Sequence, residues 1–124
     1  MKDTIEAIKV YQKRLGYDFD AMSLPERMQS FRNYMAALIV EQGELATEVQ
    51  WKPWRKISSQ KFNKRKALLE WADCYFFLID QGLALGFKAD EMKESVHHKL
   101  SVNLQRIESG YNNTKEERRQ DGTE

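Results

Sequence analysis

The stretch "ALIVEQGEL" (residues 37–45) places two acidic residues at the end of an apolar run that is typical of a buried helix. Glu41 and Glu44 are three residues apart, so on a helix they share one face, and they directly follow the apolar run from Ala36 to Val40. Burying an unpaired charge beside such a face costs several kcal/mol. The stretch therefore predicts a long helix whose acidic residues need a partner.

The flanking residues extend this helix from about Leu24 to Gln50, a length of about 40 Å at ~1.5 Å per residue. Its start is predicted by Ser23, because Pro25 and Glu26 follow it in the pattern of a capping box. Similar periodicities, bounded by turn-forming residues, predict three more helices. Their approximate ranges are 3–15, 63–85 and 90–109.

Apolar side chains recur at helical spacing along the first and last of these helices, and we expect them to face a core. In the first helix they are Ile5, Ile8, Tyr11 and Leu15. In the last helix, for which Asp90 is the predicted N-cap, they are Met92, Val96, Leu100, Leu104 and Ile107.

The composition favours an all-α fold, because only two prolines and six glycines interrupt a chain rich in helix-forming residues. We predict a four- to five-helix bundle in which residues 1–111 form a single domain. Residues 112–124 contain no apolar side chain and are predicted to form a disordered tail.

The charge and the cysteine content restrict the possible partners and the compartment. The formal net charge is +1, which gives no general reason to expect a nucleic acid or a membrane as partner. No apolar run approaches the roughly 20 residues of a membrane span, and the N-terminus lacks the apolar core of a signal peptide. Cys74 is the single cysteine and cannot form an internal disulfide. These observations predict a cytoplasmic protein.

The third predicted helix repeats the acidic pattern, because Glu70 and Asp73 are also three residues apart among apolar neighbours. Helices joined by a modest loop usually pack as antiparallel neighbours, so the two acidic pairs can converge. Crowded carboxylates raise each other's pKa, and a hard divalent cation such as Mg²⁺ or Mn²⁺ removes the conflict. The sequence thus predicts a metal site formed by Glu41, Glu44, Glu70 and Asp73.

The alternative is that these acids lie on solvated helix faces and pair with lysines, as many acidic residues at this spacing do. Glu48 lies one turn beyond Glu44, and we expect it to have a supporting role. We expect Asp80, two turns after Asp73, to be structural or exposed.

Between the two acidic pairs lies a basic segment without acidic residues, which also contains Trp51 and Trp54. Its basic residues are Lys52, Arg55, Lys56, Lys61, Lys64, Arg65 and Lys66. Cations beside a carboxylate-bound metal suit a polyphosphate, and an indole ring offers a face on which a nucleobase stacks. The alternatives are a solvated loop whose tryptophans anchor it to the core, and binding of single-stranded nucleic acid.

The fourth predicted helix carries a polar stripe beside its apolar one, formed by Lys99, Asn103 and Arg106 at spacings of four and three. Such a row of donors can reach phosphates or an acidic cluster. Most stripes of this kind are solvated, so the spacing alone leaves both interpretations open.

The order of these motifs resembles the all-α NTP pyrophosphatase superfamily, which includes the MazG-like proteins and the dimeric dUTPases. The motifs are "EQGEL", then "EWAD" about 25 residues later, then "KLSVNLQR". The segment "WKPWRK" and the ending "RIESGY" are most similar to the dimeric dUTPase branch. The resemblance covers about residues 30 to 111, and it implies a helical bundle of the MazG-like or dimeric dUTPase type with a catalytic domain over residues 1–111.

The resemblance implies Mg²⁺-dependent hydrolysis of a nucleoside triphosphate, most simply dUTP, to the monophosphate and pyrophosphate by in-line displacement. The matched metal-ligand positions are Glu41, Glu44, Glu70 and Asp73. The positions matched to phosphate contacts or to ordering of the site are Lys99, Asn103 and Arg106, and the matched loop positions are Lys52 and Trp54. Glu44 or Glu48 is then the candidate for orienting the attacking water, and Arg55 and Lys56 would offset charge on the leaving pyrophosphate.

One departure from the pattern concerns the base. Dimeric dUTPases typically carry an asparagine where Thr47 stands here, so a MazG-like enzyme with another or broader base preference is the alternative. A non-enzymatic helical interaction module is a second alternative. The small size of the chain and the apolar circumference of its third helix also predict a homodimer or homotetramer.

Overall fold

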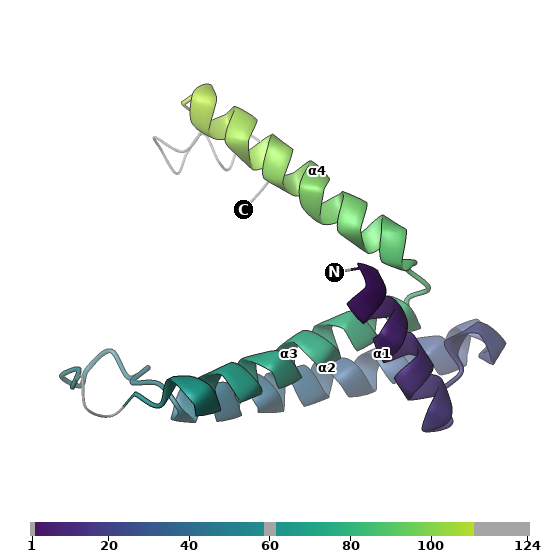
Figure 1. Ribbon diagram of the computed structural model, residues 1–124, viewed down its shortest axis with the longest axis horizontal. Coiled ribbons are helices and arrows are strands. Elements are labelled where there is room, and N and C mark those ends of the chain that lie inside the picture. The colour runs from purple at the N-terminus through teal and green to yellow at the C-terminus, as the bar shows by residue number, and fades with distance from the viewer. Residues whose placement is uncertain (1, 59–61, 111–124) are drawn as a thin grey trace. The chain divides into compact units, whose positions relative to one another are not determined.

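The computed structural model describes residues 2–58 and 62–110, and within these ranges every regular element is helical. The elements are α1 (Lys2–Arg14), the short 3₁₀ helix η1 (Phe19–Ala21), α2 (Leu24–Thr47), α3 (Lys64–Ala84) and α4 (Ala89–Glu108) (Figure 1). The predicted all-α class is confirmed. The predicted tail, residues 112–124, lies outside the described residues. The chain divides into two compact units, Met1–Ala89 and Asp90–Glu124, and each is described by itself.

The start of α2 is the capping box that the sequence predicts. Ser23 Oγ accepts a hydrogen bond from the Glu26 backbone N–H at 3.3 Å, and the Ser23 N–H donates to Glu26 Oε1 at 3.1 Å. These two bonds satisfy donors that would otherwise be unpaired at the helix start. The helix ends at Thr47, three residues before the predicted Gln50.

Helices α2 and α3 form an antiparallel pair, and they lie side by side along their lengths in Figure 1. At one end Arg27, in the first turn of α2, donates from Nε to the Ala84 carbonyl at the C-terminus of α3, at 2.9 Å. The following Gly86 has φ of +87°, and a Cβ there would collide with the Arg27 guanidinium. At the other end, α3 is capped by Asn63, whose side chain accepts a hydrogen bond from the Lys66 backbone N–H at 3.1 Å.

A small apolar core forms where α1 crosses the C-terminal half of α3. Its buried side chains are Ile5 and Ile8 of α1, Phe19 of η1, and Ile79, Leu83 and Ala84 of α3. Tyr11 and Leu15, predicted to share this core, are each more than half exposed. That prediction is wrong because the two side chains border an open groove between α1 and α3.

Helix α4 is described as part of the second unit. It begins at Ala89, so Asp90 lies in its first turn and not at the predicted N-cap. The predicted apolar stripe is present, but Val96, Leu100 and two further members, Leu104 and Ile107, are more than half exposed. Within the described parts of the chain, no helix combines the length and the hydropathy needed to cross a membrane.

Candidate active site

Three of the four predicted metal-binding acids come together between α2 and α3. Glu41 and Glu44 share one face of α2 because they are three residues apart, and Glu70 lies on the adjacent part of α3. Each offers a carboxylate oxygen, and these three oxygens lie within 4.8 Å of one another. The antiparallel packing of the two helices therefore creates a concentrated acidic cluster.

The electrostatics of the cluster are those of a site that lacks positive charge. The pKa of Glu41 is raised to about 7, first by burial and then by the neighbouring carboxyl groups, chiefly those of Glu44 and Asp73. Glu41 Oε2 and Glu70 Oε2 are buried and have no hydrogen-bond partner among the described residues. Buried carboxylate oxygens without donors are costly. A divalent cation fits this set of ligands, since hard cations prefer oxygen and offset crowded negative charge.

The other two predicted acidic residues lie at the edge of this cluster. Asp73 is exposed one turn after Glu70, and it is close enough to contribute to the raised pKa of Glu41. Glu48 is the half-buried C-cap residue of α2, one turn beyond Glu44. The structure thus brings together Glu41, Glu44 and Glu70, with Asp73 beside them.

The basic loop after α2 borders an open hollow of about 820 Å³. It is lined by Ala46, Thr47, Val49, Gln50, Trp51, Lys52, Trp54, Arg55 and Lys56, so it includes all four loop residues predicted to bind substrate. Two hydrogen bonds between the Gln50 side chain and the Ser58 backbone hold the loop closed. Lys61, also counted in the basic segment, lies outside the described residues.

The tryptophans of the loop are not anchored in the core, which was one interpretation of the sequence. Trp51 is 53% exposed and Trp54 is 70% exposed, and their rings meet edge to face with centroids 5.7 Å apart. Thr47, which replaces the asparagine of the resembling pattern, donates from Oγ1 to the Glu44 carbonyl at 2.6 Å. Its hydroxyl proton is therefore used within the helix.

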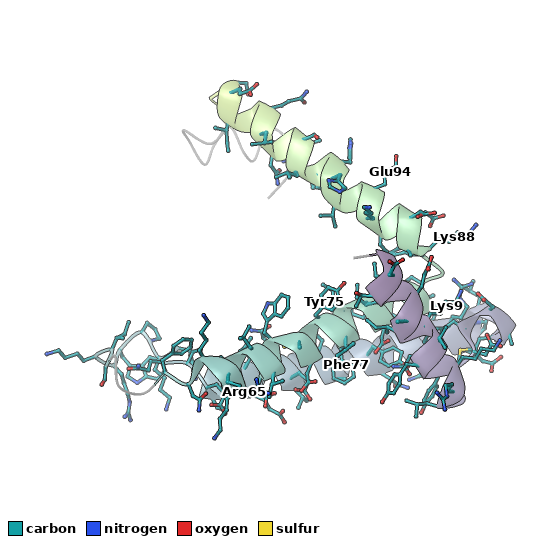
Figure 2. The ribbon with its side chains drawn as sticks, viewed as in Figure 1. Lys9, Arg65, Tyr75, Phe77, Lys88 and Glu94 are labelled. Carbon is teal, nitrogen blue, oxygen red and sulfur yellow. The ribbon has the colours of Figure 1, made fainter. Side chains whose placement is uncertain are left out.

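A second concavity, which the sequence did not predict, lies between α1 and α3. This groove has a volume of about 730 Å³ and is lined by Thr4, Ala7, Ile8, Tyr11, Gln12, Leu15, Asp73, Phe76, Phe77 and Asp80. Phe77, labelled in Figure 2, contacts the Tyr34 ring of α2 with centroids 6.4 Å apart. Asp73 belongs to the groove and also influences the acidic cluster, so the two features adjoin.

Two functional candidates in this groove were missed. Gln12 has 7% of its surface exposed and Asp80 has 1%, so of the two alternatives expected for Asp80, structural or exposed, the exposed one is wrong. Gln12 Nε2 donates to Asp80 Oδ2 at 3.1 Å across 68 residues of chain. The only signal in the sequence was the spacing of seven between Asp73 and Asp80, which puts both on one face of α3.

The polar stripe on α4 is present in the second unit. Lys99 and Asn103 are exposed and Arg106 is half-buried, and Arg106 Nη1 donates to Asn103 Oδ1 at 3.3 Å. These three residues share one face of their helix. They belong to the second unit, which is described by itself.

An acidic cluster able to hold a cation and a basic hollow at the C-terminal end of α2 together suit a phosphorylated ligand. The family model described as dUTPase matches residues 4–118, nearly the whole chain, and the chain belongs to this family. Comparison with curated proteins and with solved structures gave no match.

Membership makes the protein a hydrolase, a nucleoside triphosphate diphosphatase of the dUTPase-like kind, whose substrate is a nucleotide. The family is of the all-α MazG-like type, in agreement with the helices described above. Enzymes of the dUTPase-like kind generally use a divalent metal, and the acidic cluster is a candidate place for it. The alternative of a non-enzymatic interaction module is therefore set aside.

Proposed function

We propose that the protein is a Mg²⁺-dependent dUTP pyrophosphohydrolase, which converts dUTP and water to dUMP and pyrophosphate. The observation that carries this proposal is the convergence of Glu41, Glu44 and Glu70 within 4.8 Å, with two of their buried oxygens unpaired. Family membership supplies the reaction class. The substrate and the metal are the parts that we propose.

The chain's own groups divide the work as follows. Glu41, Glu44, Glu70 and Asp73 would hold the cation. A divalent cation bound there supplies positive charge that offsets the charge of the phosphate oxygens. Glu44 or Glu48 would orient the water that attacks phosphorus, since a carboxylate accepts the proton of a water within hydrogen-bond reach.

The triphosphate would lie towards the basic hollow. Lys52, Arg55 and Lys56 line it, and their donors match the charge and geometry of phosphate oxygens. Trp54 would contact the substrate from the same loop. By the resemblance of the sequence, Lys99, Asn103 and Arg106 would add phosphate contacts from α4.

The nucleoside would lie in the groove between α1 and α3. Phe76, Phe77 and Tyr11 offer apolar and aromatic surface, while Gln12 and Asp80 add polar groups to an otherwise apolar wall. Asp73 lines the groove and also contributes to the raised pKa of Glu41, which supports a pose in which a nucleotide bound in the groove would have its phosphates near the proposed metal. This arrangement separates recognition of the base from the chemistry on the phosphates.

The deciding experiment is pyrophosphate release from a panel of deoxynucleoside triphosphates, with magnesium and with EDTA. Release from dUTP that is selective and abolished by EDTA is the expected result. Release of pyrophosphate from nucleotides with several different bases at similar rates would favour the broader MazG-like alternative. The presence of Thr47 in place of the asparagine also supports that alternative. No release from any nucleotide would contradict the proposal.

We also propose that the active form is a homodimer or homotetramer. On α3, the side chains Leu68, Trp71 and Leu78 are each more than half exposed, at spacings of three and seven that place them on one face. The Trp71 ring stacks on Tyr75, which Figure 2 labels, and extends this apolar face. Contiguous apolar surface of this kind marks an interaction site, and a second copy of the chain is the partner that we propose.

Finally, we propose that the protein works in the reducing cytoplasm. Cys74 is buried, and burial followed by the charges of Glu41, Asp73 and Glu70 raises the pKa of its thiol. A protonated, buried thiol is unreactive. The folded protein should therefore resist alkylation, and its unfolding should be the same with and without reductant.

A further inference from the structure

Three side chains from three helices form a buried polar chain beside the groove. Tyr34 OH of α2 donates to Gln12 Oε1 of α1 at 3.2 Å, and Gln12 Nε2 donates to Asp80 Oδ2 of α3 at 3.1 Å. Among the described residues, Gln12 and Asp80 are the two buried polar or charged side chains. This hydrogen-bond network is therefore a polar exception in a contact between helices that is otherwise apolar.

The protonation states of Tyr34 and Asp80, at the two ends of this network, determine which groups donate and which accept its hydrogen bonds. Burial raises the pKa of Asp80 to about 6, so at pH 8 its carboxylate is ionised and can only accept hydrogen bonds. The pKa of Tyr34 is also raised, by burial and then by the charges of Asp80 and Tyr17, so the phenol keeps its proton. Gln12 must then turn its amide nitrogen to Asp80 and its oxygen to Tyr34.

Stability alone does not explain an acid at this position. Asp80 Oδ1 is buried and has no hydrogen-bond partner among the described residues. An unpaired buried carboxylate oxygen destabilises the fold, and a neutral amide of the same shape would cost less. What a carboxylate provides and an amide does not is an obligatory acceptor, which permits one orientation of Gln12.

The orientation of Gln12 matters because this residue lines the groove. Once bonded to Asp80 and Tyr34, the Gln12 amide retains one N–H and one oxygen lone pair in fixed positions. The pairing edge of uracil presents an N3–H donor between two carbonyl acceptors, whereas cytosine presents an N3 acceptor beside an amino donor. A fixed amide can match one of these patterns, and an amide that is free to flip can match both.

We propose that Asp80 is a positioning residue that, together with Tyr34, holds the Gln12 amide in one orientation and thereby sets the base selectivity of the groove. This inference rests on the proposed function, which places the nucleoside in that groove. Asp80 acts through Gln12 and contacts none of the reacting phosphate atoms.

The first test measures kcat and KM at pH 8 for dUTP and dCTP in wild type, Asp80→Asn and Tyr34→Phe. We expect Asp80→Asn to lower the ratio of kcat/KM for dUTP to that for dCTP by about tenfold or more, mainly through KM. Tyr34→Phe should lower this ratio less, because the Asp80 carboxylate still accepts from Gln12. The matched control is Asp20→Asn, which removes the same charge from an exposed residue paired with Lys9, and it should keep the wild-type ratio. A parallel fall with both substrates, or a wild type that does not discriminate, would overturn the inference.

The second test needs no catalysis and keeps the two proposals apart. In EDTA, dUMP and dCMP are titrated into the same variants, and the Gln12 side-chain N–H signals are followed by nuclear magnetic resonance. We expect one sharp, inequivalent pair of signals in wild type, and exchange-broadened signals with more equal affinities for the two nucleotides in Asp80→Asn.

Together, the two tests distinguish failure of the proposed reaction from failure of the inference about Asp80. Absence of hydrolysis with intact preference for dUMP in EDTA would reject the proposed reaction and keep the inference. Hydrolysis with unchanged Gln12 signals and unchanged selectivity in Asp80→Asn would reject the inference and keep the reaction. Circular dichroism of each variant checks that the helices are retained.

Discussion

Two carboxyl groups of this molecule, those of Glu41 and Asp80, are held where burial disfavours their charge, and their pKa values are raised to about 7 and about 6. Their surroundings differ. Glu41 is surrounded by further carboxylates, an arrangement that a cation relieves. Asp80 has an amide as neighbour and gains only one hydrogen bond. At the scale of single residues, the first arrangement is the proposed metal site, and the second is the proposed means of orienting Gln12.

Glu70→Gln should abolish pyrophosphate release without unfolding the protein. In EDTA its melting temperature should equal or exceed that of wild type, because one of the crowded charges is gone. Wild type should gain about 2.7 kcal/mol at a magnesium concentration of about 100 times Kd, and the variant should gain much less. Thermal unfolding with and without magnesium measures this, with exposed Glu6→Gln as the control. Activity like wild type in Glu70→Gln or Asp73→Asn would count against the metal site.

We expect titration of Asp80 to contribute to the pH dependence of the free energy of unfolding. Its pKa of about 6 in the folded protein exceeds the ordinary value of 3.8, so the folded state keeps this proton to higher pH than the unfolded state. The resulting stabilisation is full below about pH 4 and is lost as the pH rises through 6. Asp80→Asn lacks this titration.

Urea unfolding between pH 4 and pH 7 tests this expectation. The free energy of unfolding of Asp80→Asn, minus that of wild type, should increase with pH across this window. A difference that stays constant from pH 4 to pH 7 would show that Asp80 does not titrate as described.

At the scale of elements, the α2–α3 pair positions both the acidic cluster and the basic loop. Its ends are fixed by the capping box at Ser23, the Asn63 cap of α3 and the bond from Arg27 to the Ala84 carbonyl. Single turns at these ends therefore control the register of the pair, and with it the approach of Glu70 to Glu41.

Gly86→Ala, next to the C-terminus of α3, should lower the free energy of unfolding by more than Gly16→Ala does. Both glycines have positive φ, so each substitution strains the backbone by about 1 kcal/mol. At Gly86 the new Cβ must also displace Arg27, which bonds to Ala84, whereas nothing lies within 4 Å of a Cβ at Gly16. Urea denaturation of the two variants gives the comparison. Equal losses would mean that the Arg27 contact contributes nothing.

Arg55→Ala should raise the KM for dUTP by about ten- to a hundredfold, because a hydrogen bond to a charged group contributes about 1.5–3 kcal/mol. Binding of deoxyuridine, which has no phosphate, should stay unchanged if the basic hollow holds the triphosphate. Lys93→Ala, which removes an exposed cation of α4, serves as the control. Equal weakening of deoxyuridine and dUTP would place the loop against the nucleoside instead.

Local sequence predicted the helices and the acidic pairs, but not the groove between helices. The existence of the helices was predicted from periodicity, and the capping box at Ser23 correctly predicted the start of α2. The predicted end of α2 was wrong, because the helix ends at Thr47 and not at Gln50. Fraying at a helix C-terminus depends on its surroundings. The acidic pairs were visible because each is local to one helix. The groove was not, since it depends on the contact of Gln12 with Asp80, 68 residues away.

At the scale of the whole molecule, the apolar faces of single helices bear on what each helix packs against. On α3 of the first unit, Leu68, Trp71 and Leu78 are exposed. An amphipathic pattern states that a face needs to be covered and does not state what covers it. The apolar stripe of α4, expected to face a core, is described only within its own unit.

Sedimentation of wild type should give a dimer or a tetramer, and Trp71→Arg should shift it towards the monomer, because a charge on the α3 face opposes burial. Val10→Arg, on an exposed apolar residue of α1, is the matched control and should leave the association unchanged. Wild type that sediments as a monomer at assay concentrations would contradict the proposed oligomer.

The way α1 is attached has a consequence for local unfolding. This helix supplies Gln12 and much of the groove, yet it supplies none of the three clustered acids, which all belong to α2 and α3. Detachment of α1 would dismantle the groove and leave the α2–α3 hairpin able to hold a cation. Hydrogen exchange should therefore find α1 amides opening independently of α3 amides. Changes in α1 could then alter the proposed nucleoside preference through Gln12, while the acidic cluster on α2 and α3 is retained.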